Sequence, residues 1–388
     1  MKKNRFNSIL FKLIFSVFIF FTLFIFIEIL IRVTGIPGIS GSWIKSDPDI
    51  GWRNIPEHRY VFNKENDHPI IGKMNSYGWR DHEWLLIKTE QTYRVAVLGD
   101  SYIEAFQVEE DKTFLTITEN ILSQGSGINY ELMNFGRSGF TQTEEYLIIT
   151  SDIEKFNPEM YILFFLPSND IRDISKSTAQ GIRPFYIEPG HQDENIVTPY
   201  FDKSFTKSNK YKIKCFLSIF RRHSAIINFI VELILKRTNI VQASKEQNEE
   251  KLPPYFTLGT DNPDQKCKDN YNINKKLILK ISDYCKEHKK QFLLVLIDDP
   301  SYLPDNEKKY LKLDPSFSWN YFENDLQSFS MSHNINFLSL QTIARKSYLQ
   351  NKIELHWSHW NYQGHEFVAQ SLANKIKIII SQNSKSNN

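Results

Sequence analysis

Short apolar runs and longer amphipathic stretches alternate along the chain from residue 92 onward. The apolar runs are rich in β-branched and aromatic residues, a pattern typical of strands buried on both faces. They cover residues 93–98, 130–134, 160–166, 291–297 and 336–340. The amphipathic stretches have helical spacing and cover residues 111–123, with Asp111 as the expected N-cap, 143–155, 271–288, 319–332 and 364–380. This alternation predicts right-handed βαβ units, and therefore an α/β fold with a central parallel five-stranded sheet.

A longer apolar run precedes these elements near the N-terminus. Residues 13–27 contain no charged side chain, and the apolar pattern continues past Glu28 to Val33, which is enough for a transmembrane helix of about 20 residues. The alternative is a cleaved signal peptide, but its apolar run is only ~7–15 residues long and is followed by small residues, whereas Thr34-Gly-Ile-Pro-Gly38 follows here. We therefore expect residues 1–35 to form an uncleaved single-pass anchor. The basic residues before it predict a cytoplasmic N-terminus and a periplasmic or otherwise extracytoplasmic domain.

Residues 36–91 are rich in Gly, Pro and Trp and contain a turn signal at Asp47-Pro-Asp-Ile-Gly51. We interpret them as a lead-in segment that connects the anchor to one domain at residues 92–382, which a polar tail at residues 383–388 follows. Within the lead-in, Arg80 and Asp81 are able to pin the segment to the domain through charged hydrogen bonds. A solvated polar turn explains these two residues equally well.

An insertion at residues 171–272 interrupts the strand–helix alternation. Its second part holds two apolar bursts, at residues 216–220 and 225–235, and three basic or histidine residues separate them. Each burst is too short to span a bilayer. We expect a helical cap over the carboxyl end of the sheet, and a helix on the membrane surface is the alternative.

Composition excludes several classes of function. The net charge of +2 is spread along the chain, so electrostatics give no case for nucleic-acid binding. Cys215, Cys267 and Cys285 lack C-x-x-C spacing, so we expect no zinc site. Outside the cytoplasm they allow one disulfide and leave one thiol over, with no pair favoured. The chain has no glycine-rich phosphate loop, and we expect neither a metal nor an organic cofactor.

Four short blocks carry the candidate chemistry. Gly99-Asp100-Ser101 ends the first apolar run, and open α/β sheets bind their ligands at the carboxyl ends of strands, although Gly, Asp and Ser are also common in ordinary turns. The other blocks are residues 134–141, 166–170 and 359–365. This ordered set resembles the SGNH (GDSL-like) hydrolase family over roughly residue 75 to the last helix. The resemblance implies a flavodoxin-like three-layer α/β/α fold.

The resemblance also implies a role for each block. Ser101 matches the nucleophile, and His359 matches the base that removes its proton, since Gly364 and His365 beyond it complete the last motif. The oxyanion donors are the backbone N–H groups of Ser101 and Gly139 and the side-chain amide of Asn169. Asp100 and His365 are expected to be structural, and plain turn or cap roles remain the alternatives for Gly139 and Asn169.

Two positions depart from the family pattern. An aspartate is expected two or three residues before the histidine, to orient the imidazole, but Trp357 and His356 stand there. A backbone carbonyl or a water, Glu354, or His356 are the substitutes, in that order of preference. Pro167 stands where the family usually has glycine, which bears on the loop geometry rather than on Asn169.

These features predict a membrane-anchored serine esterase or acyl-transfer enzyme that acts outside the cytoplasm through an acyl-serine intermediate. By analogy with the family, the substrate is an O-acyl glycan, and a lipid ester is also open because of the anchor and the apolar insertion. The other hypothesis is a catalytically idle glycan-binding or assembly module, which the missing aspartate favours. The motif at Ser101 is not the G-x-S-x-G elbow of α/β-hydrolases. The sequence leaves the oligomeric state open.

Overall fold

The computed structural model describes most of the chain. The described residues are 2–34, 44–47, 50–62, 64–175, 178–179, 185–186, 200–201, 207–231, 233–234, 237 and 251–386. Most of the insertion's first part therefore lies outside the described residues, and so does most of the stretch that joins its second apolar burst to residue 251. A cap in those parts stays a prediction.

Five parallel strands form the centre of the protein. They are β5 (Thr92–Gly99), β6 (Asn129–Gly136), β7 (Met160–Phe165), β10 (Gln291–Leu296) and β11 (Asn336–Ser339). They coincide with the five apolar runs, and all six residues of β7 are buried, as expected for a strand covered on both faces. The spatial order is β11-β10-β7-β5-β6 with every pair parallel. This is the doubly wound flavodoxin-like order, which confirms the predicted fold class.

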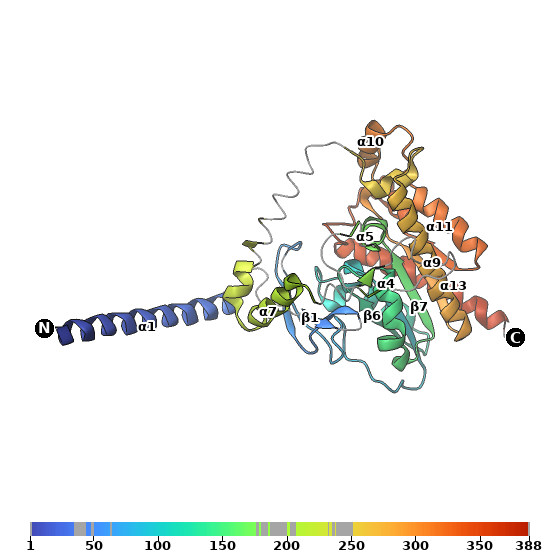
Figure 1. Ribbon diagram of the computed structural model, residues 1–388. Helices are drawn as coiled ribbons and strands as arrows, with labels where there is room; N and C mark the ends of the chain where they lie inside the picture. The colour runs from blue at the N-terminus through green and yellow to red at the C-terminus, as the bar shows by residue number, and fades with distance from the viewer. Residues whose placement is uncertain are drawn as a thin grey trace.

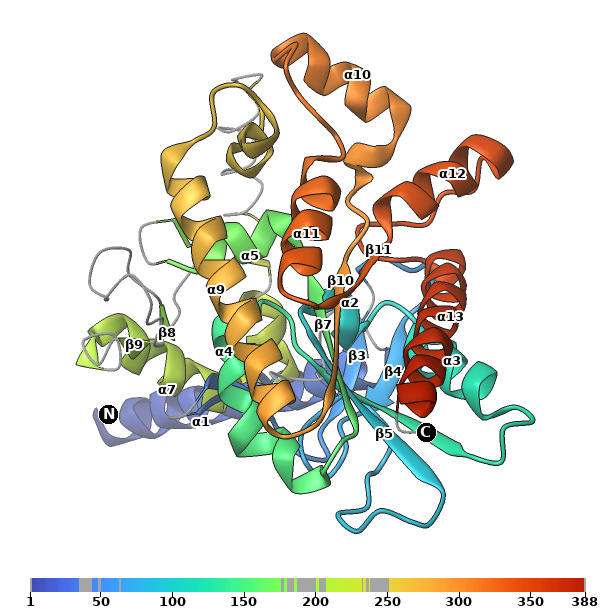
Figure 2. The ribbon, with the colours of Figure 1, turned by 90° about the vertical axis from the view of Figure 1, so that its right-hand side faces the viewer.

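Helices cover both faces of the sheet and complete three layers (Figure 2). On one face, α3 (Phe114–Ser123) packs beside α13 (Tyr362–Ser386). On the other face lie α4 (Gln142–Ile148), α9 (Gln265–Glu287) and α11 (Tyr321–Ser332). Each face has its own apolar core, because alternate side chains of a strand point to opposite faces.

Several element boundaries differ from the predicted ones. Asp111 is not the N-cap of α3: it lies in a 3-10 turn, η1 (Glu110–Lys112), and the Thr113 hydroxyl accepts the capping hydrogen bond. Helix α9 begins at Gln265, earlier than expected, because the Asp264 carboxylate accepts a hydrogen bond from the Cys267 N–H and caps the helix there. Helix α4 ends at Ile148 and continues as a π turn, η2 (Ile149–Ile153), and a 3-10 turn, η3 (Glu154–Phe156).

Other described elements connect this framework. The short helices that the sequence did not predict are α2 (Ser101–Glu104), α5 (Pro167–Asp173), α10 (Pro304–Leu313) and α12 (Gln341–Asn351). Two further 3-10 turns are η4 (Pro254–Gly259) and η5 (Pro300–Tyr302), and β8 (Phe185–Tyr186) pairs with β9 (Tyr200–Phe201). All three cysteines are free, so the disulfide that composition allowed does not form.

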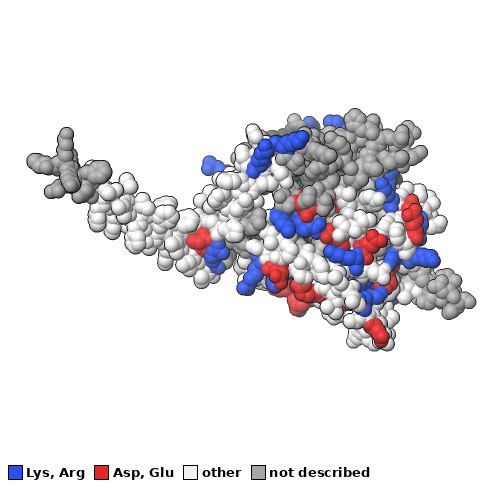
Figure 3. Space-filling model, turned by 60° about the horizontal axis from the view of Figure 1, so that its bottom comes forward, with Lys and Arg blue, Asp and Glu red and all other residues white. Residues whose placement is uncertain are grey.

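Helix α1 (Lys2–Thr34) extends away from the body of the protein (Figure 1). The most apolar 18-residue window of its stretch Ile9–Thr34 has a mean hydropathy of 2.8, and only 6% of that window is buried. Figure 3 shows the surface of this stretch almost free of charged side chains until it reaches the body. Length and composition therefore make α1 a candidate membrane span.

Helix α7 (Asn209–His223) of the insertion packs against the lead-in. It contacts β1 (Ile44–Asp47) of the lead-in, and the ring of Tyr211 lies 5.9 Å from the ring of Trp52. A second helical stretch at residues 225–231 follows it and packs against the end of α1. In Figure 1, α7 lies between α1 and the body.

The lead-in folds into two antiparallel hairpins. The first joins β1 (Ile44–Asp47) to β2 (Gly51–Asn54), and the second joins β3 (Arg59–Phe62) to β4 (Ile70–Lys73). Cross-strand pairs in short hairpins contribute little by themselves. The hairpins therefore depend on their contacts with the domain.

Arg80 and Asp81 provide those contacts, and both are buried. The Arg80 guanidinium donates to the Tyr60 hydroxyl at 2.7 Å and to the Val108 carbonyl at 2.5 Å. The Asp81 carboxylate accepts from the backbone N–H of Asn134 on β6 at 2.8 Å. The two residues thus join the lead-in to the domain, and the structure decides for this alternative over a solvated turn.

Replacing Asp81 should destabilise the fold. Asp81→Ala leaves the Asn134 N–H and the Trp84 indole N–H without their acceptor, and each unsatisfied buried donor costs about 1–3 kcal/mol. We expect a loss of about 3 kcal/mol in the free energy of unfolding, measured by urea denaturation of the full chain in detergent. The exposed Lys73→Ala on β4 should change it by less than about 0.5 kcal/mol. Equal stabilities for the two variants would contradict the assigned role of Asp81.

Candidate active site

Ser101 stands at the carboxyl end of β5, where the strand order of the sheet changes direction: β6 lies on one side of β5 and β7 on the other. The chain leaves the strand at Gly99 and begins α2 at Ser101, and the Asp100 carboxylate caps that helix by accepting from the Tyr102 N–H at 2.9 Å. This is the switch point at which doubly wound sheets bind ligands. The local sequence therefore places the Ser101 hydroxyl at this end of the sheet, while the Asp100 side chain is used to cap α2.

His359 faces Ser101 from a loop near the C-terminus. The Ser101 Oγ lies 2.7 Å from the His359 Nε2, within hydrogen-bond reach. An isolated antiparallel β-bridge between the backbones of His356 and Trp360 stabilises the loop. The Trp360 indole N–H also donates to Asp298 at 2.7 Å. Helix α13 packs closely against this loop at Gly364. A Cβ at this position would lie 2.2 Å from the Leu355 carbonyl oxygen, so only glycine allows the close approach.

The third member of the arrangement is Glu65, which no sequence motif indicated. Its Oε1 lies 2.7 Å from the His359 Nδ1, and its Oε2 accepts from the His359 backbone N–H at 2.9 Å. Glu65 lies between β3 and β4, at the tip of the lead-in's second hairpin. Burial on its own would raise the pKa of Glu65, but the hydrogen bonds and charge of His359 outweigh it and lower that pKa below the ordinary value. The carboxylate is thus ionised where it orients the imidazole.

Neither side chain proposed for this role contacts the imidazole Nδ1. Glu354 is exposed, and its backbone carbonyl accepts a hydrogen bond from the Asn361 side chain. The His356 ring lies 3.5 Å from Asp298, and burial lowers its pKa to about 4. The preferred substitute, a backbone carbonyl or a water, is also displaced, because Glu65 occupies that position. The expectation for the orienting group was therefore wrong.

Asn169 reaches the site from α5, just after β7. Its side-chain amide donates to the Asp100 carboxylate at 2.6 Å. This hydrogen bond uses one of the two N–H groups of the amide. It holds the amide nitrogen near the carboxyl end of β5, next to Ser101. Pro167 starts α5 at its first turn, a position that proline suits, so the departure from the family pattern is accommodated locally.

Gly139 lies in the loop after β6. Its φ is +80°, a left-handed conformation that glycine adopts without strain. The preceding Ser138 donates from its backbone N–H at 2.7 Å and from its hydroxyl at 2.5 Å to Glu104 of α2. The loop is thus fastened to the short helix that Ser101 begins.

Buried carboxyl groups lie behind these donors. Asp170 accepts from the Leu166 N–H and from the Gln142 amide, and Gln142 also donates to Glu145. Burial raises the pKa of Asp100, and it raises the pKa of Asp170 and of Glu145 well above the ordinary value. These groups support the loops of the site and are shielded from solvent.

His365 has a structural role. It is fully buried, its Nδ1 accepts from the Phe114 backbone N–H at 3.1 Å, and burial lowers its pKa to about 3. The neutral ring therefore joins α13 to the start of α3.

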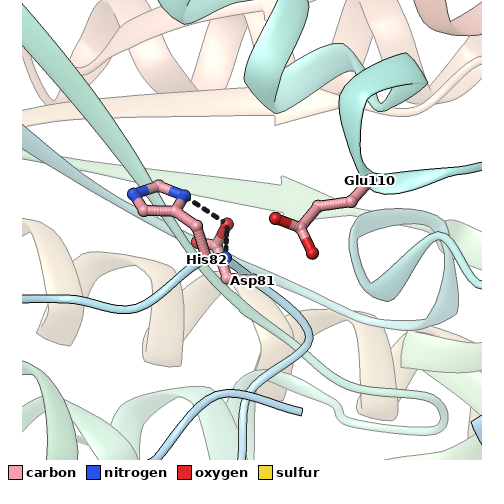
Figure 4. Close-up of side chains that lie close together, drawn as sticks. All are labelled: Asp81, His82 and Glu110. Atoms are coloured by element: carbon pink, nitrogen blue, oxygen red, sulfur yellow. Dashed lines mark hydrogen bonds and ion pairs between the residues drawn. The ribbon is translucent and has the colours of Figure 1, made fainter. Parts of the chain in front are cut away.

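Asp81, His82 and Glu110 form a separate group whose ligand-type atoms lie within 4.8 Å of one another (Figure 4). Asp81 already accepts from the backbone and ring nitrogens of His82 at 2.9 and 3.0 Å. The hydrogen bond to Asp81 raises the pKa of His82 to about 9, so the ring is a cation at neutral pH, and metal ions bind neutral imidazole. The group is consistent with an ion pair that reinforces the lead-in.

Comparisons with known proteins give structural matches only. No protein-family model matches the chain, and no curated protein matches it. Among solved structures, an acetyl xylan esterase, AlAXEase, is similar with 13% identity and a TM-score of 0.41, covering 72% of this chain and 98% of its own. A protein assigned to the lipolytic G-D-S-L family from Desulfitobacterium hafniense has 10% identity and a TM-score of 0.35, covering 73% and 98%. A catalytic mutant of an acetylxylan esterase from Geobacillus stearothermophilus has 10% identity and a TM-score of 0.37, covering 75% and 96%.

These matches are of the kind that the sequence resemblance implied. Because the structures share so little sequence with this chain, the strand order carries the fold assignment. The geometry of the site carries the functional proposal.

Replacing Glu65 with its amide should disable the site without disturbing the hairpin. In Glu65→Gln the side-chain N–H can donate to Nδ1, which places the imidazole proton on Nε2, where it cannot accept the serine proton. We expect the rate at which a fluorophosphonate modifies Ser101 to fall by roughly 10²-fold or more. Asp67→Asn, at an exposed carboxylate on the same hairpin tip, should react like the wild type. Equal rates for Glu65→Gln and Asp67→Asn would contradict the role of Glu65.

The His82 ion pair should give a defined pH dependence of stability. Its pKa is raised from 6.5 to about 9 on folding, so its stabilisation is fully present below pH 6.5 and is lost as the pH rises through about 9. The Tm difference between the wild type and His82→Gln should therefore shrink across this interval. Thermal unfolding at several pH values measures it, with the exposed His288→Gln as control. A difference that stays constant from pH 6 to pH 10 would be evidence against the pair.

Proposed function

We propose that the protein is a membrane-anchored serine esterase or acyl-transfer enzyme. The observation that supports this proposal is the continuous series of short contacts from Ser101 Oγ to His359 Nε2, and from His359 Nδ1 to Glu65. A serine hydroxyl needs a base to become a nucleophile, and the base needs an orienting acceptor on its other nitrogen. All three are within hydrogen-bond distance here.

The reaction begins when His359 takes the proton from the Ser101 hydroxyl as Oγ attacks the acyl carbon. The carbonyl oxygen becomes an oxyanion, which the N–H groups of Ser101 and Gly139 and the second N–H of the Asn169 amide stabilise. His359 then gives its proton to the leaving alcohol as the ester bond breaks, and Ser101 carries the acyl group. Water or another alcohol, deprotonated by His359, attacks the acyl-serine and restores the free hydroxyl.

Glu65 acts through His359. Its ionised carboxylate keeps the imidazole proton on Nδ1 and offsets the positive charge that the ring acquires during the attack. The idle glycan-binding alternative depended on the lack of a carboxylate beside His359. Glu65 removes that reason.

The substrate and the location are the finer parts of the proposal. We propose that α1 spans a membrane with a cytoplasmic N-terminus, because basic residues precede the apolar stretch. The catalytic domain then lies outside the cytoplasm, where O-acyl glycans of the cell envelope are its substrates. A lipid ester is the competing substrate.

Turnover and trapping of an acyl-enzyme test this proposal. The full chain in detergent is treated with 4-nitrophenyl acetate, and the peptide that contains Ser101 is analysed by mass spectrometry. We expect release of nitrophenol and an acetyl group on Ser101, with turnover reduced roughly 10⁴-fold or more in Ser101→Ala and His359→Ala. Ser126→Ala, at an exposed turn serine, should retain full activity. A folded wild type without turnover, or activity that survives in Ser101→Ala, would overturn the proposal.

Comparison of substrates then tests the finer part. Acetylated xylo-oligosaccharides and short-chain diacylglycerols are offered to the wild type and to Ser101→Ala. Release of acetate from the sugar, dependent on Ser101, supports the glycan substrate. Selective hydrolysis of the diacylglycerol would replace it with the lipid ester.

A further inference from the structure

The two helices of the insertion contact the C-terminal end of α1. The Glu28 carboxylate accepts from the backbone N–H groups of Ala225 at 2.7 Å and Ile226 at 3.0 Å, and from the Ser224 hydroxyl at 3.0 Å. These N–H groups begin the helical stretch 225–231, and a carboxylate at a helix N-terminus is favourable. The one acidic residue in the apolar part of α1 thus has a defined structural partner.

Further contacts strengthen this junction. Arg32 pairs with Glu28 at 2.7 Å and donates to the His223 carbonyl, at the end of α7, at 3.0 Å. Ile31 and Ala225 are buried against each other, and Ile226 and Phe229 pack around them. The last turns of α1 and the start of the second insertion helix therefore form one packed unit.

This junction lies at the level where the membrane would end. Residues 9–27 extend about 28 Å at about 1.5 Å per residue, which matches a hydrocarbon core of about 30 Å. Glu28 then stands at the boundary between the acyl chains and the headgroups. Helices attached at Glu28 lie at the same boundary.

Both helices present apolar faces without a partner among the described residues. On α7, Ile213, Phe216, Leu217 and Phe220 recur at helical spacing on one face and are each between 41% and 60% exposed. On the second helical stretch and just beyond it, Ile230 and Leu233 are also exposed. Apolar patches of this kind on a protein surface mark an interaction site.

The charge of this region identifies the occupant. The sequence of α7 contains basic residues and no acidic residue. Lys207, Lys212 and Arg237 of the same region are exposed. An apolar face combined with a basic polar face is the pattern of helices that lie in the membrane interface, where anionic headgroups attract Lys and Arg.

We propose that α7 and the helical stretch 225–231 lie in the interface of the same bilayer that α1 spans, with their apolar faces toward the acyl chains. This rests on the proposed anchoring by α1. Because α7 also contacts β1 and Trp52 of the lead-in, the lead-in is connected to the bilayer both through α1 and through α7. The orientation of the catalytic domain relative to the membrane is then fixed, whereas α1 alone would leave it free to rotate.

Fluorescence quenching by lipids at defined depth tests this proposal. An NBD fluorophore is attached to Phe216→Cys in full chain that also carries Cys215→Ser, and the protein is placed in nanodiscs of phosphatidylcholine and phosphatidylglycerol. The native Cys267 and Cys285 are buried and remain unlabelled. Phe18→Cys, at the middle of the apolar stretch of α1, is the control for spanning, and the exposed Lys308→Cys on α10 is the control for a position far from the membrane.

The expected result is a different depth for each label. Lipids with a doxyl group near the headgroup should quench the label at residue 216 most strongly, those with a deep doxyl group should quench the label at residue 18, and neither should quench residue 308. Ile213→Cys, on the same face of α7, should repeat the result for residue 216. Removing phosphatidylglycerol should reduce the quenching at residue 216 and leave residue 18 unchanged.

Three contrary results have different meanings. Quenching at residue 18 without quenching at residues 213 and 216 would overturn the interfacial placement and leave the anchor intact. If emission at residue 216 instead changed with the number of protein copies per nanodisc, a second copy would be the occupant of the face. Absence of quenching at residue 18 as well would show that the proposed anchoring itself fails.

Discussion

The contact between Glu65 and His359 is the interaction on which the candidate site depends. A carboxylate at the tip of the lead-in's second hairpin holds both ring orientation and backbone of a histidine 294 positions away in sequence. The hairpin is short and is held by the domain through Arg80 and Asp81. Stability and chemistry are therefore coupled, because loss of lead-in docking removes the group that orients the imidazole.

The surrounding charges show why Glu65 suits this role. Asp100, Asp170 and Glu145 are buried, and burial raises the pKa of each. Glu65 is also largely buried, yet its pKa is lowered, because the side-chain and backbone hydrogen bonds of His359 and the charge of its ring favour the ionised carboxylate. A carboxyl group without such a partner would favour its neutral form and would stabilise the protonated imidazole less.

The segments outside the sheet form one connected assembly. The lead-in touches the site at Glu65 and the insertion at Trp52, and the insertion touches the end of α1 at Glu28. The lead-in and the insertion thus link the candidate anchor to the candidate catalytic residues. Packed side chains and hydrogen bonds therefore connect the proposed membrane anchor to the candidate site.

By itself, the sequence determined the five strands, their parallel α/β arrangement, the apolar helix at the N-terminus, and Ser101 and His359 as the candidate nucleophile and base. These features have local signals, since buried strands are continuous apolar runs and the motifs at strand ends are contiguous. Only the tertiary structure decided that Glu65 completes the site, that Thr113 rather than Asp111 caps α3, and that α7 joins α1. The hairpin tip at Glu65 looks like any polar turn along the chain, and its role comes from a contact between distant segments. Such contacts depend on how the elements pack against one another. The spacing of residues along the chain carries no local signal for them.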